Sequence, residues 1–167
     1  DLVIVSTLNS APVADAGPGQ TGQVGNTVLL TGAGSTNIDG DPLTYQWSLL
    51  AAPAESTALL VSPTSVTPSL TLDKFGTYLV QLVVHDGTVA SAPDTMTIDT
   101  LNSSPIAQAG SDQSTVVGET VTLDGSQSSD ADGNPLNYQW SLSTKPLAST
   151  ALLLNPTTPH PSFTIDK

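Results

Sequence analysis

The 167-residue sequence predicts an all-β protein that contains two copies of one antiparallel sandwich of two sheets. Three observations support this prediction. Short apolar-alternating segments recur between turns rich in Gly, Pro and Asp, and no window shows sustained helical periodicity. Residues 1–74 also align with residues 94–167 without a gap, and more than half of the aligned pairs are identical. The resulting period of 93 residues has the size of one small domain.

Seven strands are expected in the first complete copy, separated by turn signals such as Asp39–Pro42 and Asp86–Gly87. The first strand is a short edge segment, where the N–H that proline lacks is not needed for pairing. The third and sixth segments alternate most clearly. The seven segments are Pro12–Ala16, Asn26–Thr31, Leu43–Leu49, Ala58–Val61, Ser69–Leu72, Gly76–Val84 and Thr95–Thr100.

The alternation also predicts which side chains point into the core. Each copy has one tryptophan, Trp47 or Trp140, which is expected to lie between the sheets as the largest core side chain. Tyr78, near the start of its strand, has the position of a structural tyrosine corner. The predicted inward side chains are Val28, Leu30, Tyr45, Trp47, Leu49, Tyr78, Val80, Leu82 and Val84.

The repeat alignment predicts the domain organisation. Residues 1–9 match the final strand of a preceding repeat and a junction, residues 10–101 a complete domain, and residues 102–167 an incomplete second domain that lacks its last two strands. A proline three residues after Asn9 and Asn102 indicates short, stiff junctions. We interpret the sequence as an excerpt from a longer array of repeats. A polymer in which neighbouring chains complete each other by strand addition is the alternative.

The composition excludes several classes of function. The formal net charge is −12 and Lys and Arg together number three, which argues against nucleic-acid binding and against attraction to anionic membranes. The absence of cysteine removes disulfides, thiol nucleophiles and zinc thiolate sites. No apolar run is long enough to predict a membrane span.

Acidic side chains alternate on two equivalent Gly-containing turns, and oxygen ligands in this pattern can converge on one hard cation such as calcium. Asp86, beside a neighbouring Gly turn, is expected to add an oxygen. In the alternative interpretation, the carboxylates form good turns and are simply solvated. The candidate calcium ligands are Asn37, Asp39, Asp41, Asp86, Asp130, Asp132 and Asn134.

The sequence does not predict an enzyme. His160 corresponds to Thr67 in the other copy, so a shared mechanism based on histidine is not encoded. Asp39 and Asp41 lie on an exposed turn without an aromatic cleft to bind a sugar or raise a pKa. No Gly-rich phosphate loop follows a strand and opens a helix. His85 and His160 are therefore expected to be ordinary strand-end and loop residues.

Three segments together resemble one family. They are PVADAG at 12–17, DGDPLTYQW at 39–47 and GTYLVQLVVHDG at 76–87. In this order they resemble the PKD (polycystic kidney disease) repeat, in the form of bacterial surface proteins that carries Tyr-Gln-Trp-Ser-Leu on its third strand. The more familiar form has Trp-Asp-Phe-Gly-Asp-Gly there, so this sequence is a variant. The resemblance covers residues 10–101 and continues through residue 167.

The resemblance implies tandem immunoglobulin-like antiparallel β-sandwiches in an extracellular chain, with the second copy truncated. Some PKD-like domains bind calcium near the acidic turn, which supports calcium as the possible ion here. The expected function is a non-catalytic structural or adhesion module on a bacterial cell surface, forming a rod, fibre or filament. Its partners would be neighbouring repeats of the same or identical chains, or a host or matrix protein or polysaccharide. The alternative is an accessory substrate- or carbohydrate-binding domain of a secreted hydrolase.

Overall fold

The computed structural model describes residues 1–4 and 6–167 and divides the chain into two compact units, residues 1–102 and residues 103–167. The regular elements of the described residues are all β-strands, which confirms the predicted fold class. No helix long and apolar enough to span a membrane occurs in this described part of the chain.

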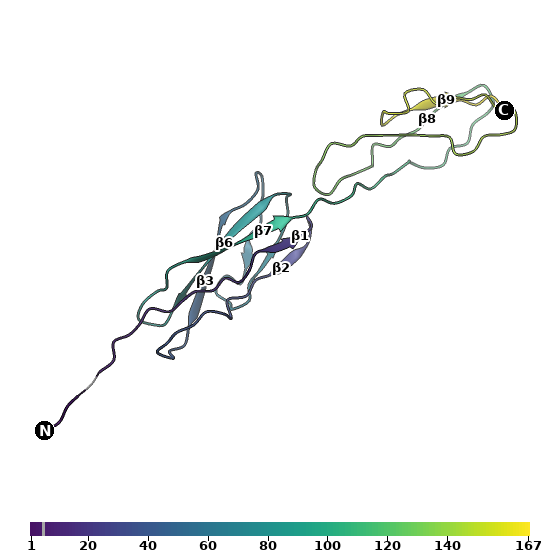
Figure 1. Ribbon diagram of the computed structural model, residues 1–167. Helices are drawn as coiled ribbons and strands as arrows, with labels where there is room; N and C mark the ends of the chain where they lie inside the picture. The colour runs from purple at the N-terminus through teal and green to yellow at the C-terminus, as the bar shows by residue number, and fades with distance from the viewer. Residues whose placement is uncertain (5) are drawn as a thin grey trace. The chain divides into compact units, whose positions relative to one another are not determined.

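Unit 1 is a sandwich of two sheets (Figure 1). The larger sheet has the strand order β1-β7-β6-β3, and the smaller has the order β2-β5-β4. Neighbouring strands are antiparallel except β1 and β7, which run parallel. The strands are β1 (Gln20–Gly22), β2 (Thr27–Leu29), β3 (Thr44–Ala51), β4 (Leu60–Val61), β5 (Ser69–Thr71), β6 (Thr77–His85) and β7 (Asp94–Thr100).

All the predicted strands form except the first. Between Pro12 and Ala16, only Val13 forms an isolated bridge, to Thr36. The Ala16 N–H donates to the Asp94 carboxylate at 2.8 Å, so a side chain replaces a neighbouring strand as its acceptor. The prediction of a strand at Pro12–Ala16 was therefore wrong.

Strand β1 was not predicted, because its sequence, Gln-Thr-Gly, shows no apolar alternation. It pairs with Ile98–Thr100 of β7. A Cβ atom at Gly22 would lie 2.8 Å from the Leu72 Cδ1 atom, closer than real contacts allow. The main chain of β1 itself packs against the core here, and a strand held in this way leaves no periodic signal in the sequence.

The core of unit 1 surrounds Trp47, which is 1% exposed. Its indole Nε1–H donates to the Ser65 carbonyl at 3.2 Å, so the polar edge of the ring is also satisfied. Tyr45 and Leu49 pack against the core and are partly buried. The other predicted inward residues are buried: Val28, Leu30, Tyr78, Val80, Leu82 and Val84. The predicted alternation of β2, β3 and β6 is confirmed.

Tyr78 forms the expected corner. Its hydroxyl accepts the Lys74 N–H at 2.8 Å and lies 2.9 Å from both Asp73 Oδ1 and the Lys74 carbonyl, to which it can donate. Burial of the ring raises the pKa of Tyr78. Hydrogen bonds from the Ser56 hydroxyl, the Thr57 N–H and Tyr78 hold the pKa of Asp73 well below its usual range. The start of β6 is thereby fastened to the segment that precedes it.

Unit 2 has only two named strands, β8 (Thr120–Thr122) and β9 (Ser162–Thr164), which are antiparallel. Residues 137–144, the counterpart of β3, form no strand. At the repeat offset, the positions that correspond to β6 fall beyond residue 167, so the structure describes residues 137–144 without that neighbouring strand. Trp140 keeps the indole hydrogen bond, to the Thr158 carbonyl at 3.1 Å, but is only partly buried.

The segment 1–9, expected to be the final strand of a preceding repeat and a junction, is grouped with unit 1. It includes Val5, which lies outside the described residues. The other residues of the segment belong to no strand, and Leu2, Val3 and Ile4 are exposed.

The two tryptophans provide a matched test of core burial. Trp47→Ala should destabilise unit 1 by about 3–5 kcal/mol, because it removes a fully enclosed ring and leaves a cavity. Trp140→Ala should cost unit 2 much less, because its ring is already partly in water. Hydrogen exchange of the β6 and β8 amides at increasing urea concentrations measures the stability of unit 1 and of unit 2 separately. Equal losses in the two units would contradict this account.

Candidate functional site at the acidic turns

The two acidic turns fold by the same local contacts. In unit 1 the Asn37 side-chain oxygen accepts the Asp39 N–H at 3.2 Å, and the Asn37 carbonyl accepts the Gly40 N–H at 3.2 Å. Gly40 has φ of 81°, a left-handed conformation that favours glycine. In unit 2 Asp130 takes the place of Asn37 and accepts the Asp132 N–H at 2.8 Å. Turn formation therefore requires an oxygen at the first position but not a charge.

Asp86 caps a second turn and is 6% exposed. Its Oδ1 accepts the N–H groups of Thr88 and Val89 at 2.7 and 2.8 Å, and its Oδ2 accepts the Asn9 side-chain amide at 2.9 Å. The hydrogen bond from Val89, followed by those from Asn9 and Thr88, lowers the pKa of Asp86 to about 2. Asp86 therefore stays ionised while it holds Asn9.

In unit 1, the turn that contains Asp39 and the turn that Asp86 caps both bind the segment of chain that enters the unit. The Ser10 N–H donates to Asp39 Oδ2 at 2.6 Å, and the preceding residue, Asn9, donates to Asp86. We call the four residues Asn9, Ser10, Asp39 and Asp86 the junction clamp. Unit 2 repeats one half of it, since the Ser103 N–H donates to Asp132 Oδ2. Two successive junction residues are thus bound by carboxylates of the domain that follows them.

The junction clamp was not predicted, although the sequence carries a signal for it. The dipeptide Asn-Ser occurs at both junctions, and the middle acidic residue is Asp in both turns, Asp39 and Asp132. The flanking positions differ, because Asn37 and Asp41 in one turn correspond to Asp130 and Asn134 in the other. The structure assigns a contact to the invariant middle position: it binds the junction backbone.

The predicted calcium ligands are distributed over these turns. Asp39 and Asp86 are joined through the neighbouring residues Asn9 and Ser10, and Asp41 is exposed. Within the described residues, no group of three or more Asp, Glu, His or Cys side chains converges as a metal site would. In unit 2, however, Asp132 Oδ1 is buried and has no hydrogen-bond partner. Calcium binding therefore stays a prediction.

Each histidine has a local structural partner. His85 Nδ1 accepts the Gly87 N–H at 2.8 Å, which places the proton of the neutral ring on Nε2. His160 Nε2 lies 3.2 Å from Asp124 Oδ1, and both side chains are more than half exposed. These contacts order a turn and a loop, and neither presents a nucleophile beside a base.

The lowered pKa of Asp86 predicts acid sensitivity. An unfolded aspartate has a pKa of about 3.9, and the folded value is about 2. Asp86 therefore stabilises the fold fully above about pH 5, and this contribution is lost as the pH falls toward 2. Asp86→Asn should lower the thermal midpoint at pH 7 and flatten its decline between pH 5 and pH 2. An equally steep acid decline in the variant would refute this role.

Residues 9–99 and 102–144 match the family model of the PKD domain. The chain is 36% identical over 146 residues to the mouse "Dyslexia-associated protein KIAA0319 homolog", a match that covers 83% of this chain and 13% of that protein. The human "Dyslexia-associated protein KIAA0319" is 32% identical over 145 residues, again 83% of this chain and 13% of the relative. The chain thus spans about an eighth of the length of these curated relatives.

A solved structure supports the fold assignment. A nucleoside hydrolase-related hypothetical protein from Saccharophagus degradans, described as associated with carbohydrate metabolism, aligns with a TM-score of 0.50 and 20% identity over 56% of this chain and 26% of that one. The sandwich of unit 1, the corner at Tyr78 and the family match agree. The chain belongs to the PKD domain family.

Proposed function

We propose that this chain is a non-catalytic structural and adhesive part of an extracellular protein, in which tandem PKD domains form a rod or surface fibre. The junction clamp is the observation that carries this proposal. A domain that binds the junction before it with two carboxylates restricts the freedom of that junction. An array of such domains would transmit position and force along its length, as a spacer must.

The location and the partners follow from the same reasoning. A chain without cysteine and with a net charge of −12 suits an exposed surface that is kept soluble by repulsion. We place it outside the cell, on a cell surface that we infer to be bacterial. Its nearest partners would be neighbouring repeats of the same or identical chains, with a host or matrix protein or polysaccharide as the adhesive target. Assembly into a filament would appear in negative-stain images of the purified chain.

The structure of unit 1 does not support the alternative function, an accessory substrate- or carbohydrate-binding domain of a secreted hydrolase. A domain that binds polysaccharide needs a row of exposed aromatic rings, on which the sugar rings stack. Trp47 and Tyr78 are buried and Tyr45 packs against the core, so the one exposed aromatic ring of unit 1 among the described residues, Phe75, forms no row. The structural and adhesive function is therefore the one we favour.

The proposed stiffness is tested at the junction between the two domains. Backbone amide order parameters at Ser103 and Ser104 should be about 0.85 in the native chain and fall below about 0.6 in Asp132→Ala. Asp41→Ala removes an exposed carboxylate of the other turn and should leave these values unchanged. A native junction that is already flexible would contradict the stiff-rod function, whatever the variants do.

Calcium is proposed as a stiffening ion at the acidic turns, supported by the unpartnered, buried Asp132 Oδ1. At about 1 mM calcium and a Kd of about 10–100 μM, binding would stabilise the folded state by roughly 1.4–2.7 kcal/mol. A calcium titration of thermal unfolding measures this gain, and Asp132→Asn should reduce it. An unchanged midpoint at millimolar calcium would remove the ion from the proposal.

A further inference from the structure

The dipeptide Asp-Gly occurs four times in the chain, at Asp39, Asp86, Asp124 and Asp132. In this dipeptide the glycine nitrogen can attack the side-chain carboxyl carbon of the preceding aspartate, because glycine has no side chain that hinders the approach. The product is a succinimide ring, which reopens to aspartate or to isoaspartate. The four dipeptides share this chemistry, so the folded structure decides which of them reacts.

Three conditions favour the attack in a folded chain. The carboxylate must be able to turn toward the next main-chain nitrogen, the glycine N–H must be weakly held, and the forming ring needs space. Each hydrogen bond that has to open first makes the reaction about fivefold slower.

The dipeptide of Asp39 and Gly40 meets all three conditions. Both residues are exposed. Among the described residues, the Asp39 carboxylate accepts one hydrogen bond, from the Ser10 N–H. The Gly40 N–H donates to the Asn37 carbonyl at 3.2 Å, at the long end of the range for such bonds. A Cβ atom at Gly40 would meet no other atom within 4 Å, so the ring has space to form.

The dipeptide of Asp86 and Gly87 is held more firmly. Asp86 is buried, and its carboxylate accepts three hydrogen bonds, from two main-chain N–H groups and from the Asn9 side chain. The Gly87 N–H donates to His85 Nδ1 at 2.8 Å. Ring closure at Asp86 therefore has to open several hydrogen bonds first.

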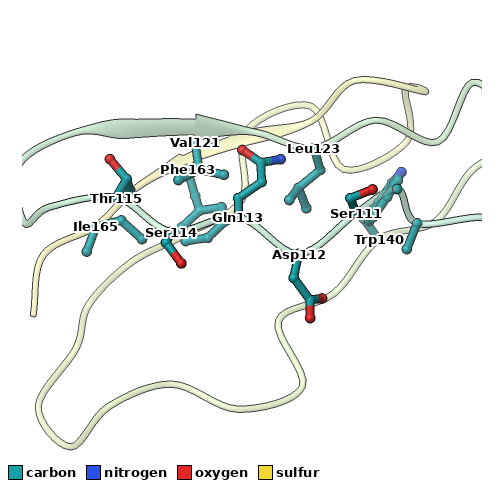
Figure 2. A pocket seen from close by; sticks show the side chains of 12 residues that line it. Ser111, Asp112, Gln113, Ser114, Thr115, Val121, Leu123, Trp140, Phe163 and Ile165 are labelled. Carbon is teal, nitrogen blue, oxygen red and sulfur yellow. The ribbon is translucent and has the colours of Figure 1, made fainter.

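The dipeptide of Asp124 and Gly125 is restrained by packing. Gly125 is buried, and its N–H donates to the Pro159 carbonyl at 2.8 Å. A Cβ atom at Gly125 would lie 2.8 Å from the ring of Trp140. Trp140 belongs, with Phe163, to the interior side chains that Figure 2 shows. The main chain at this dipeptide is therefore too closely packed to turn and close a ring.

The fourth dipeptide resembles the first but is less open. The Gly133 N–H donates to the Asp130 carbonyl at 3.2 Å, as the Gly40 N–H does to Asn37. Asp132 is half-buried, however, and its Oδ1 is enclosed. Asp132 should therefore react more slowly than the exposed aspartate of the first dipeptide.

We propose that Asp39 is the position at which the folded chain forms isoaspartate, and that this change opens the contact between Asp39 and Ser10 in the junction clamp. A bond forms between the Gly40 nitrogen and Asp39 Cγ, and the hydroxyl of the carboxyl group leaves with the amide proton as water. A water molecule then adds to the former main-chain carbonyl and breaks its bond to the Gly40 nitrogen. The conversion needs no oxidant or cofactor and leaves the mass unchanged.

The change alters the clamp because isoaspartate carries the main chain through Cβ and Cγ. The main chain becomes one atom longer at this position, and the free carboxylate is attached directly to Cα. The turn that begins at Asn37 then loses its geometry, and the Ser10 N–H, now 2.6 Å from Asp39 Oδ2, loses its acceptor. Asp86 still binds Asn9. One carboxylate instead of two then holds the junction, whether or not the chain has the adhesive role proposed above.

The site is tested on the 167-residue chain, kept folded at neutral pH and physiological temperature for several weeks in calcium-free buffer. Proteolysis and electron-transfer fragmentation then give the isoaspartate content at each position. Asp39 should contain about tenfold more isoaspartate than Asp86 or Asp124. Asp41 should contain none, because Pro42 has no N–H. A parallel sample in guanidinium chloride should show similar contents at all four dipeptides, since unfolding removes their different restraints.

The effect on the clamp is tested by hydrogen exchange of the Ser10 amide before and after this ageing. A fraction of molecules equal to the isoaspartate content at Asp39 should exchange the Ser10 amide about fivefold faster. Asp39→Glu is the control, because its longer side chain would have to close a six-membered ring. Ageing of this variant should form no isoaspartate at position 39 and leave its Ser10 exchange rate unchanged.

Three results would overturn the proposal. The first is an equal isoaspartate content at the four dipeptides of the folded chain, and the second is no isoaspartate at Asp39 when the unfolded sample forms it. The third is an unchanged Ser10 exchange rate in molecules that carry isoaspartate at position 39.

Discussion

The enclosure of one indole ring by the central strand β6 is the interaction on which the rest of unit 1 depends. Trp47 lies between the two sheets, and β6 supplies four buried side chains on one face. The duplicated sequence provides the comparison within the same chain. Trp140 has the same neighbours in sequence and the same indole hydrogen bond, and it is partly exposed in residues 103–167, which stop before the position of a β6 counterpart. Local sequence therefore orients the tryptophan, and the long strand buries it.

The strands that could be predicted are those in which apolar and polar residues alternate along the sequence, because one face of the strand is buried. β3 and β6 alternate over seven or more residues, and both formed as expected. The prediction of a strand at Pro12–Ala16 was wrong, because the alternation was too short to distinguish a strand from a loop. The loop is held by the side chain of Asp94. β1 was missed because a glycine main chain, rather than a side chain, contacts the core at Gly22.

The candidate site could be predicted at the level of turns but not of contacts. The acidic Gly turns were evident from the sequence, and the structure confirms their local hydrogen bonds at Asn37 and Asp130. The junction clamp joins residues far apart in sequence, such as Asn9 and Asp86, and no local pattern encodes such a pairing. The identical Asn-Ser dipeptides were the available signal in the sequence. Only the three-dimensional structure shows that carboxylates bind them.

The parallel pairing of β1 with β7 has a mechanical consequence. β1 lies near the N-terminal side of the domain sequence and β7 near its C-terminal side, so tension along the chain pulls the two strands from opposite ends. Their hydrogen bonds are then loaded in shear and must rupture together, instead of opening one after another as in a peeled hairpin. A domain tethered in this geometry yields abruptly at a threshold load and keeps its length until that load is reached.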